Sequence, residues 1–96
     1  MNENVYKTIG LCLKAGKLIY GTYKVLDRYK KYNDLKLIIV AIDAPVSVKQ
    51  RYKDFTITRF VLDRETISKI LGRNSEIVIG ILDEGFSSLI SSGLGG

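Results

Sequence analysis

One short run of residues constrains the fold of this chain more than any other feature. Residues 35–41 read Leu-Lys-Leu-Ile-Ile-Val-Ala, and all but one of these side chains are apolar. A nearly continuous β-prone run is typical of a central strand that needs cover on both of its faces. The run leads into Asp43-Ala44-Pro45, where the fixed φ of proline suits a turn or the first residue of a helix. The chain therefore has to place other elements on both sides of this strand.

The residues around this run alternate between helical and extended patterns. Asn4 is expected to cap a first helix that ends near Lys14 or Ala15, before Gly16, and Thr22 is expected to cap a second helix. Further strands are expected at 18–20, near a sheet edge at 55–62, and at 76–82, with helices at about 47–53, at 63–71 and from 83 through 90, and a flexible tail at 91–96. Strands that alternate with helices predict an α/β fold, here a three-layer α/β/α sandwich around a small mixed sheet of about four strands.

Length and cysteine content limit both the domain organisation and the chemistry. The 96 residues contain no repeat and no linker, so we expect one domain over 1–96 with its core at about 3–92. Cys12 is the only cysteine and histidine is absent, which excludes an internal disulfide and histidine-based catalysis and leaves no metal site or cofactor to expect. The opening residues carry acid and lack an apolar run, so we expect a cytoplasmic protein with no signal peptide and no membrane partner. The oligomeric state is open, with a monomer favoured.

Two features resemble enzyme motifs and are better explained otherwise. The stretch from Gly10 to Lys17 looks like a phosphate-binding loop, but five residues separate its glycines instead of four, and Leu18 replaces the magnesium-binding Ser or Thr. Carboxylates follow strand ends at Asp43 and at 83–84, where active-site groups of open α/β sheets often lie. Turns and helix caps also favour acidic residues at such positions, and we prefer that interpretation. We therefore predict that the protein is not an enzyme.

The positive charge of the chain is concentrated in its first two-thirds. Residues 1–60 carry twelve Lys/Arg and five Asp/Glu, a balance of +7, whereas residues 61–96 carry three and five, a balance of −2, which together give the net +5. Such an imbalance favours an anionic partner, most often a nucleic acid, because basic side chains neutralise phosphates and release counterions. A role in solubility alone is the alternative.

The densest basic segment surrounds the expected start of the second helix. Gly21 lets a sugar-phosphate backbone approach closely, and a helix N-terminus offers free N–H groups to a phosphate. Tyrosines at 20, 23, 29 and 32 are available to stack on unpaired bases. An ordinary solvated face is the alternative explanation. The basic residues of this segment are Lys14, Lys17, Lys24, Arg28, Lys30 and Lys31, of which Lys24, Arg28 and Lys31 are spaced to share one helix face.

Several motifs, in order and spacing along nearly the whole chain, resemble the ribosomal-protein L-seven-Ae superfamily, and most closely its small bacterial YlxQ-like branch. The motifs are Ala15-Gly16-Lys17-Leu18 with Gly21 and Val25-Leu26, the strand exit at 39–44, Leu71-Gly72-Arg73, and 78–81 with Asp83-Glu84-Gly85-Phe86. The resemblance implies an α/β/α sandwich, no catalysis, and binding to kink-turn or similarly bent RNA, including ribosomal RNA. Carried onto this chain, the RNA surface of the family comprises Lys17, Gly21 and Thr22; Asp43, Ala44 and Pro45; and Arg73, Asn74 and Ser75.

The chain departs from the family at the positions that are expected to recognise RNA bases. The best kink-turn binders place Asn, Glu and Lys two, three and six residues after the glycine, and here these positions hold Tyr23, Lys24 and Asp27. The acidic residue often found before Asp43 is replaced by Ile42. Two hypotheses follow: an RNA-binding protein that uses its basic surface, or a protein-interaction module of the same fold that has lost kink-turn recognition.

Overall fold

The structure is a computed structural model that describes residues 3–95. A four-stranded mixed sheet lies at its centre, with strand order β1-β4-β2-β3. β4 is antiparallel to both β1 and β2, and β3 is parallel to β2. The elements are α1 (Glu3–Lys14), β1 (Leu18–Tyr20), α2 (Thr22–Tyr32), β2 (Leu37–Val40), α3 (Val46–Tyr52), β3 (Thr58–Phe60), α4 (Arg64–Leu71), β4 (Val78–Ile81) and α5 (Glu84–Gly93).

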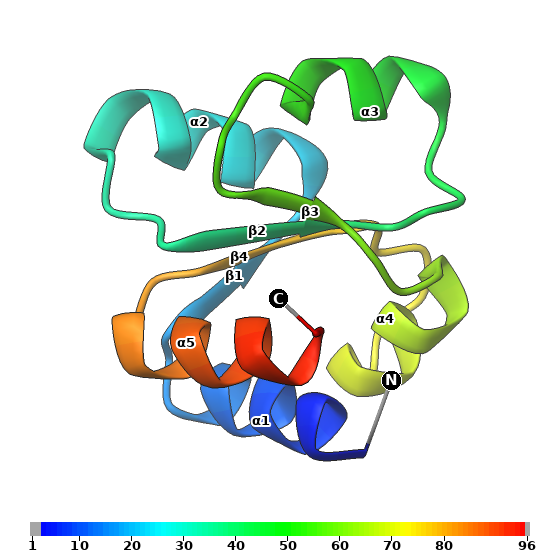
Figure 1. Ribbon diagram of the computed structural model, residues 1–96. Coiled ribbons are helices and arrows are strands. Elements are labelled where there is room, and N and C mark those ends of the chain that lie inside the picture. The colour runs from blue at the N-terminus through cyan, green and yellow to red at the C-terminus, as the bar shows by residue number, and fades with distance from the viewer. Residues whose placement is uncertain (1–2, 96) are drawn as a thin grey trace.

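Helices cover both faces of this sheet. α2 and α3 lie on one face, and α1, α4 and α5 lie on the other (Figure 1). The three-layer α/β/α sandwich predicted from the sequence is therefore confirmed. The apolar run at 35–41 supplies β2, whose four residues are all buried, as a strand covered on both faces requires.

The two central strands pack closely against their neighbours. All four residues of β4 are buried, like those of β2. Gly80 faces the α2 layer, where a Cβ built on it would lie 2.7 Å from Leu35 Cδ2 and 3.3 Å from Val25 Cγ1. Because these distances are shorter than normal van der Waals contacts, only glycine fits this position without a shift of its neighbours.

The edge strand is shorter than the sequence pattern indicates. β3 spans only Thr58–Phe60, although it lies at the sheet edge as expected. Phe55, predicted to be part of this strand, instead stacks on the Tyr29 ring at a centroid distance of 4.0 Å and meets the Tyr52 ring edge-on at 5.7 Å. Phe55 therefore belongs to an aromatic cluster between α2 and α3 and does not extend the strand.

Three predictions at helix ends are wrong. α1 already includes Asn4, which was expected to cap it. The N-cap of α2 is Gly21, with φ 116°, and not Thr22, which is the first helical residue. The tail predicted from residue 91 is helical through Gly93, because Leu94 packs against the core and Gly93 lies directly on the Val5 side chain. The last residue of that tail, 96, lies outside the described residues.

Other helix ends follow the sequence signals closely. Asp63 caps α4 by accepting a hydrogen bond from the Thr66 N–H at 2.8 Å, and Gly72 ends that helix with φ 68°. Asp83 caps α5 by accepting from the Phe86 N–H at 2.9 Å. Over residues 3–95, no helix has both the length and the apolar character needed to cross a membrane.

Candidate nucleic-acid interface

Three connecting segments meet at one end of the sheet. The Gly21 N–H donates to the Val78 carbonyl at 3.0 Å, and the Ala41 N–H donates to the Ile77 carbonyl at 2.8 Å. The last residues of β1 and β2 and the first residue of β4 therefore lie side by side. We name the segments that leave the sheet here, residues 20–24, 41–46 and 72–77, the loop end. It brings together Gly21 and Thr22 with the two loops, 43–45 and 73–75, that the sequence singled out.

The first turn of α2 lies at the loop end with its backbone N–H groups free of side-chain caps. Gly21, the N-cap, makes no side-chain cap hydrogen bond, and the first turn contains no acidic residue. The first intrahelical bond runs from the Val25 N–H to the Gly21 carbonyl at 3.0 Å, which leaves the N–H groups of residues 22–24 without an intrahelical acceptor. These groups and the positive end of the helix dipole favour an anion.

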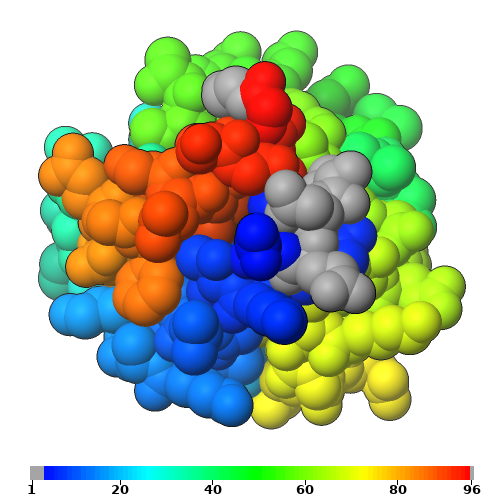
Figure 2. Space-filling model, turned by 60° about the horizontal axis from the view of Figure 1, so that its bottom comes forward, coloured from blue at the N-terminus to red at the C-terminus, as the bar shows by residue number. Residues whose placement is uncertain are grey.

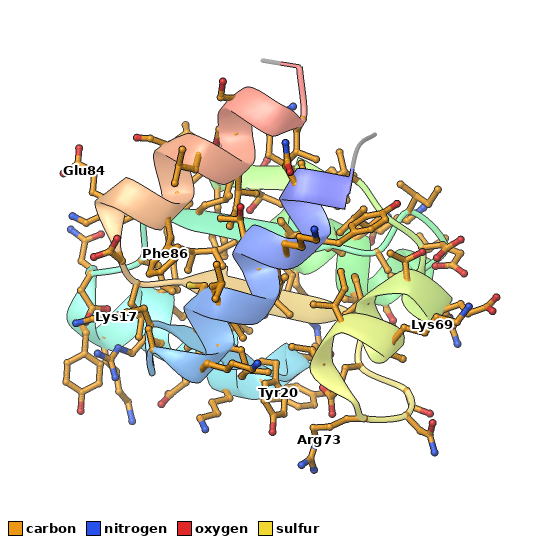
Figure 3. All side chains as sticks on the ribbon, turned by 90° about the horizontal axis from the view of Figure 1, so that it is seen from below. Lys17, Tyr20, Lys69, Arg73, Glu84 and Phe86 are labelled. Atoms are coloured by element: carbon orange, nitrogen blue, oxygen red, sulfur yellow. The ribbon has the colours of Figure 1, made fainter. Side chains whose placement is uncertain are left out.

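Two arginine–tyrosine pairs flank this turn. The guanidinium of Arg73 lies 5.1 Å from the centroid of the Tyr20 ring, and both side chains are seen from below in Figure 3. The guanidinium of Arg51, on α3, lies 5.0 Å from the centroid of the Tyr23 ring. Stacking on a ring holds a guanidinium in place and leaves its N–H donors available to phosphate oxygens. The sequence indicated Arg73 but not Arg51, because no sequence signal indicates that α3 packs beside the start of α2.

A buried tyrosine holds the start of α2 against α3. The Tyr52 hydroxyl donates a hydrogen bond to the Thr22 carbonyl. The Tyr52 side chain is fully buried, and this burial raises its pKa to about 12, so the hydroxyl keeps its proton at neutral pH. This bond and the Arg51–Tyr23 contact fix the position of the first turn of α2.

The loop at 41–46 presents apolar side chains, not charge. Ile42 is 51% exposed and Val46 is 68% exposed, whereas Ala44 is buried, so only its backbone is available. Asp43 is engaged within the chain: its carboxylate accepts a hydrogen bond from the Arg64 N–H at 2.9 Å and lies 3.6 Å from the Arg64 guanidinium. Exposed Ile42 and Val46, which the sequence did not indicate, add apolar surface to that of Tyr23, which is 68% exposed.

The basic face predicted on α2 is largely paired within the chain. Arg28 binds the Asp34 carboxylate with two nitrogens, at 2.9 and 2.5 Å, and this pairing lowers the pKa of Asp34. Lys31 lies 3.3 Å from Asp27. Of the three residues expected to share this face, Lys24 alone has no ion pair within the part of the chain that the structure describes.

Lys17 lies away from the loop end, and Lys14 lines a groove with Ile70 of α4. The Lys17 carbonyl accepts a hydrogen bond from the Leu82 N–H, which places it beside the last residues of β4, opposite the end where Gly21 meets Val78. Figure 3 shows the side chains of Lys17 and Arg73 well apart. Among the side chains of residues 4–95, the cations at the loop end or next to it that are not in ion pairs are therefore Lys24, Arg73 and, on α3, Arg51, and Glu76 is a carboxylate at the loop end that is not in an ion pair.

Asp83 and Cys12 have structural roles here. Asp83 caps α5, as the preferred interpretation expected. Cys12 is buried on α1, its thiol donates to the Lys17 carbonyl at 3.3 Å, and burial raises its pKa to about 11, which keeps it protonated and unreactive at neutral pH. The described residues contain no cluster of three or more metal-ligating side chains.

Comparison with known proteins supports the fold. No protein-family model and no curated protein matches the sequence. A solved structure of a Bacillus halodurans protein of unknown function superposes with a TM-score of 0.84, at 23% identity, over 95% of this chain and 96% of that chain. The 15.5kD RNA binding protein of Giardia lamblia superposes with a TM-score of 0.72, at 13% identity, over 96% of this chain and 82% of that chain. The chain therefore shares its fold with an RNA-binding protein.

Proposed function

We propose that this protein binds structured RNA through the loop end and catalyses no reaction. One observation carries the proposal: the uncapped first turn of α2 lies between two arginine–tyrosine pairs, next to a loop that exposes apolar side chains. The fold shared with the Giardia RNA binding protein supports it.

Each part of the loop end suits a different part of an RNA molecule. The N–H groups of residues 22–24, Lys24, Arg51 and Arg73 attract phosphates. Tyr23, Ile42 and Val46 offer flat or apolar contact surface to bases that are not stacked in a helix. Bases of this kind occur in bulges and sharp bends. We therefore propose a kink-turn or a similarly bent RNA as the target, ribosomal RNA included.

The choice of target follows from phosphate attraction and shape rather than from base edges. In kink-turn binders the second, third and sixth residues after the glycine are Asn, Glu and Lys, and here they are Tyr23, Lys24 and Asp27. Asp27 lies 3.3 Å from Lys31 and so is already paired. We expect this protein to discriminate between bent and straight RNA more strongly than between sequences.

A fluorescence-anisotropy titration tests the proposal. The probes are a kink-turn RNA, a straight duplex of the same composition and an unrelated hairpin, each at two salt concentrations. We expect the kink-turn RNA to bind most tightly. Lys24→Ala should weaken its binding severalfold, whereas Lys36→Ala, an exposed lysine beside the last residue of β4, should leave it unchanged. Absence of binding to all three RNAs contradicts the proposal and favours the protein-interaction hypothesis.

A further inference from the structure

A groove lies in the other helical layer, between α1 and α4. Figure 2 shows α1, in blue, between α5 and α4 on this face of the molecule. The groove has a volume of about 410 Å³ and lies on the face of the sheet opposite α2 and α3. It is lined by Lys7, Gly10, Leu11, Lys14 and Ile70.

The lining combines an apolar centre with positive ends. Leu11 is 57% exposed at the centre, beside Ile70 of α4. Lys7 and Lys14 are exposed on either side of it, two helical turns apart, which corresponds to about 10 Å along the helix axis. No acidic residue lines the groove, and among the side chains of residues 4–95 neither lysine is in an ion pair. The groove is therefore complementary to an apolar group flanked by negative charges.

Gly10 is an independent sign that something occupies this groove. It lies in the interior of α1, where glycine is less favourable than alanine. A Cβ built on Gly10 meets nothing within 4 Å, and its φ is not in the left-handed range that favours glycine. Neither packing within the chain nor backbone geometry thus calls for glycine. Its effect is to keep the floor of the groove open, so that another chain can approach the helix closely.

We propose that this groove binds an acidic amphipathic helix of a partner protein. An apolar side chain of that helix lies over Gly10 and against Leu11 and Ile70. Carboxylates on either side of it, about two turns apart, pair with Lys7 and Lys14. The apolar floor and the absence of aromatic rings from its lining favour a peptide over RNA. This site does not depend on the RNA function proposed for the loop end.

Peptide display on the full chain tests the proposal. A library of random peptides is selected against the immobilised protein. We expect enriched peptides with an apolar residue between acidic residues at helical spacing. Their affinity should fall at least tenfold for Leu11→Ala and for the pair Lys7→Glu/Lys14→Glu. The matched controls are Leu89→Ala, an equally exposed leucine on α5, and Lys36→Glu/Lys53→Glu, and both should bind within twofold of the wild type.

Gly10→Gln separates the docking role from a structural one. Glutamine favours the helix and fills the floor, so we expect the melting temperature to stay the same or rise while peptide affinity falls at least tenfold. RNA affinity of this variant and of Leu11→Ala should remain at the wild-type value. The proposal is overturned if selection yields no acidic amphipathic peptide, if the peptides bind the groove variants as well as the wild type, or if RNA affinity falls in parallel with peptide affinity.

Discussion

Two glycines of this chain have opposite effects on its stability. Gly10 lies in a helix, where an added Cβ would meet open space, and Gly80 lies in the central sheet, where an added Cβ would lie 2.7 Å from Leu35 Cδ2. Replacing each glycine by alanine therefore distinguishes the effect of helix preference, at Gly10, from the effect of side-chain packing, at Gly80.

Gly10→Ala is expected to stabilise the protein. Alanine is preferred over glycine in a helix interior by about 1 kcal/mol, and nothing here obstructs its methyl group. For a domain of this size that corresponds to a rise in melting temperature of about 4–8 °C. Thermal unfolding followed by circular dichroism measures it, and a lower melting temperature would show that the space is not open.

Gly80→Ala is expected to destabilise the protein. Its methyl group would lie 2.7 Å from Leu35 Cδ2, and the position of β4 between β1 and the fully buried β2 limits relaxation. Overpacking of this kind costs about 1–3 kcal/mol. Urea unfolding measures the loss, and a stability equal to that of the wild type would mean that Leu35 can move aside at no cost.

The Arg28–Asp34 pair makes stability depend on pH. The guanidinium of Arg28 lowers the pKa of Asp34 below its ordinary value of 3.8. A carboxyl whose folded pKa is lowered contributes its stabilisation above the unfolded value and loses it as the pH falls through the folded value. Asp34→Asn should therefore lower the melting temperature at pH 6 and reduce its further fall towards pH 2. Asp54→Asn, at an exposed carboxylate, is the control, and an equal effect of both variants would contradict the role of the pair.

The start of α2 depends on a contact from another element. Its first turn has no side-chain cap, and the Tyr52 hydroxyl bonds to the carbonyl of its first residue. The start of α2 is thus positioned by α3, which also carries Arg51. The two helices of this layer therefore form one unit at the loop end.

Tyr52→Phe is expected to lower both stability and RNA affinity. Loss of the hydroxyl leaves the Thr22 carbonyl without this donor, which costs about 0.5–1.5 kcal/mol. The first turn of α2 is then less well fixed, so we expect RNA binding to weaken severalfold. Tyr29→Phe, in a ring that stacks on Phe55, is the control and should change RNA binding little. Unchanged RNA affinity of Tyr52→Phe would show that the hydroxyl does not position the interface.

Local signals were sufficient to predict the elements and their order. The apolar run at 35–41 predicted the central strand, and Asp63 marked a helix start because its side chain reaches a nearby N–H group. The start of α2 was placed wrongly because its cap depends on the positive φ of Gly21 and on Tyr52, which is distant in sequence. Helix and strand type could thus be predicted from nearby residues, whereas ends fixed by tertiary contacts could not.

The sequence indicated which loops lie at the candidate site, but it did not indicate which of the basic side chains are in ion pairs. The resemblance to a known family indicated segments 43–45 and 73–75, and the structure places both at the loop end with Gly21. Spacing on α2 indicated Arg28 as a free cation, but the chain turns at Asn33, with φ 51°, and brings Asp34 back onto it. The spacing of residues along α2 does not indicate where residues beyond the end of the helix lie, so this pairing could not be predicted from the sequence.

Across the whole molecule, the positive charges fall into separate groups. Lys24, Arg51 and Arg73 are at the loop end or next to it, and Lys17 and Lys36 are beside the last residues of β4, at the opposite end of the sheet. If the three loop-end cations contact phosphates, the slope of log affinity against log salt should be between about −2 and −3. The net charge of +5 alone would not distinguish the two groups.

The salt dependence of RNA binding by two matched double variants tests the central claim most directly. Lys24→Ala/Arg73→Ala and Lys17→Ala/Lys36→Ala each remove two positive charges, from the loop end and from the opposite end of the sheet. With the kink-turn RNA, the first pair should weaken binding at least tenfold. One of the three cations remains, and because each phosphate contact contributes about −0.9 to the slope, the slope should be close to −1. The second pair should keep the wild-type slope. Equal slopes for the two variants, or a flatter slope for Lys17→Ala/Lys36→Ala alone, would contradict RNA binding at the loop end.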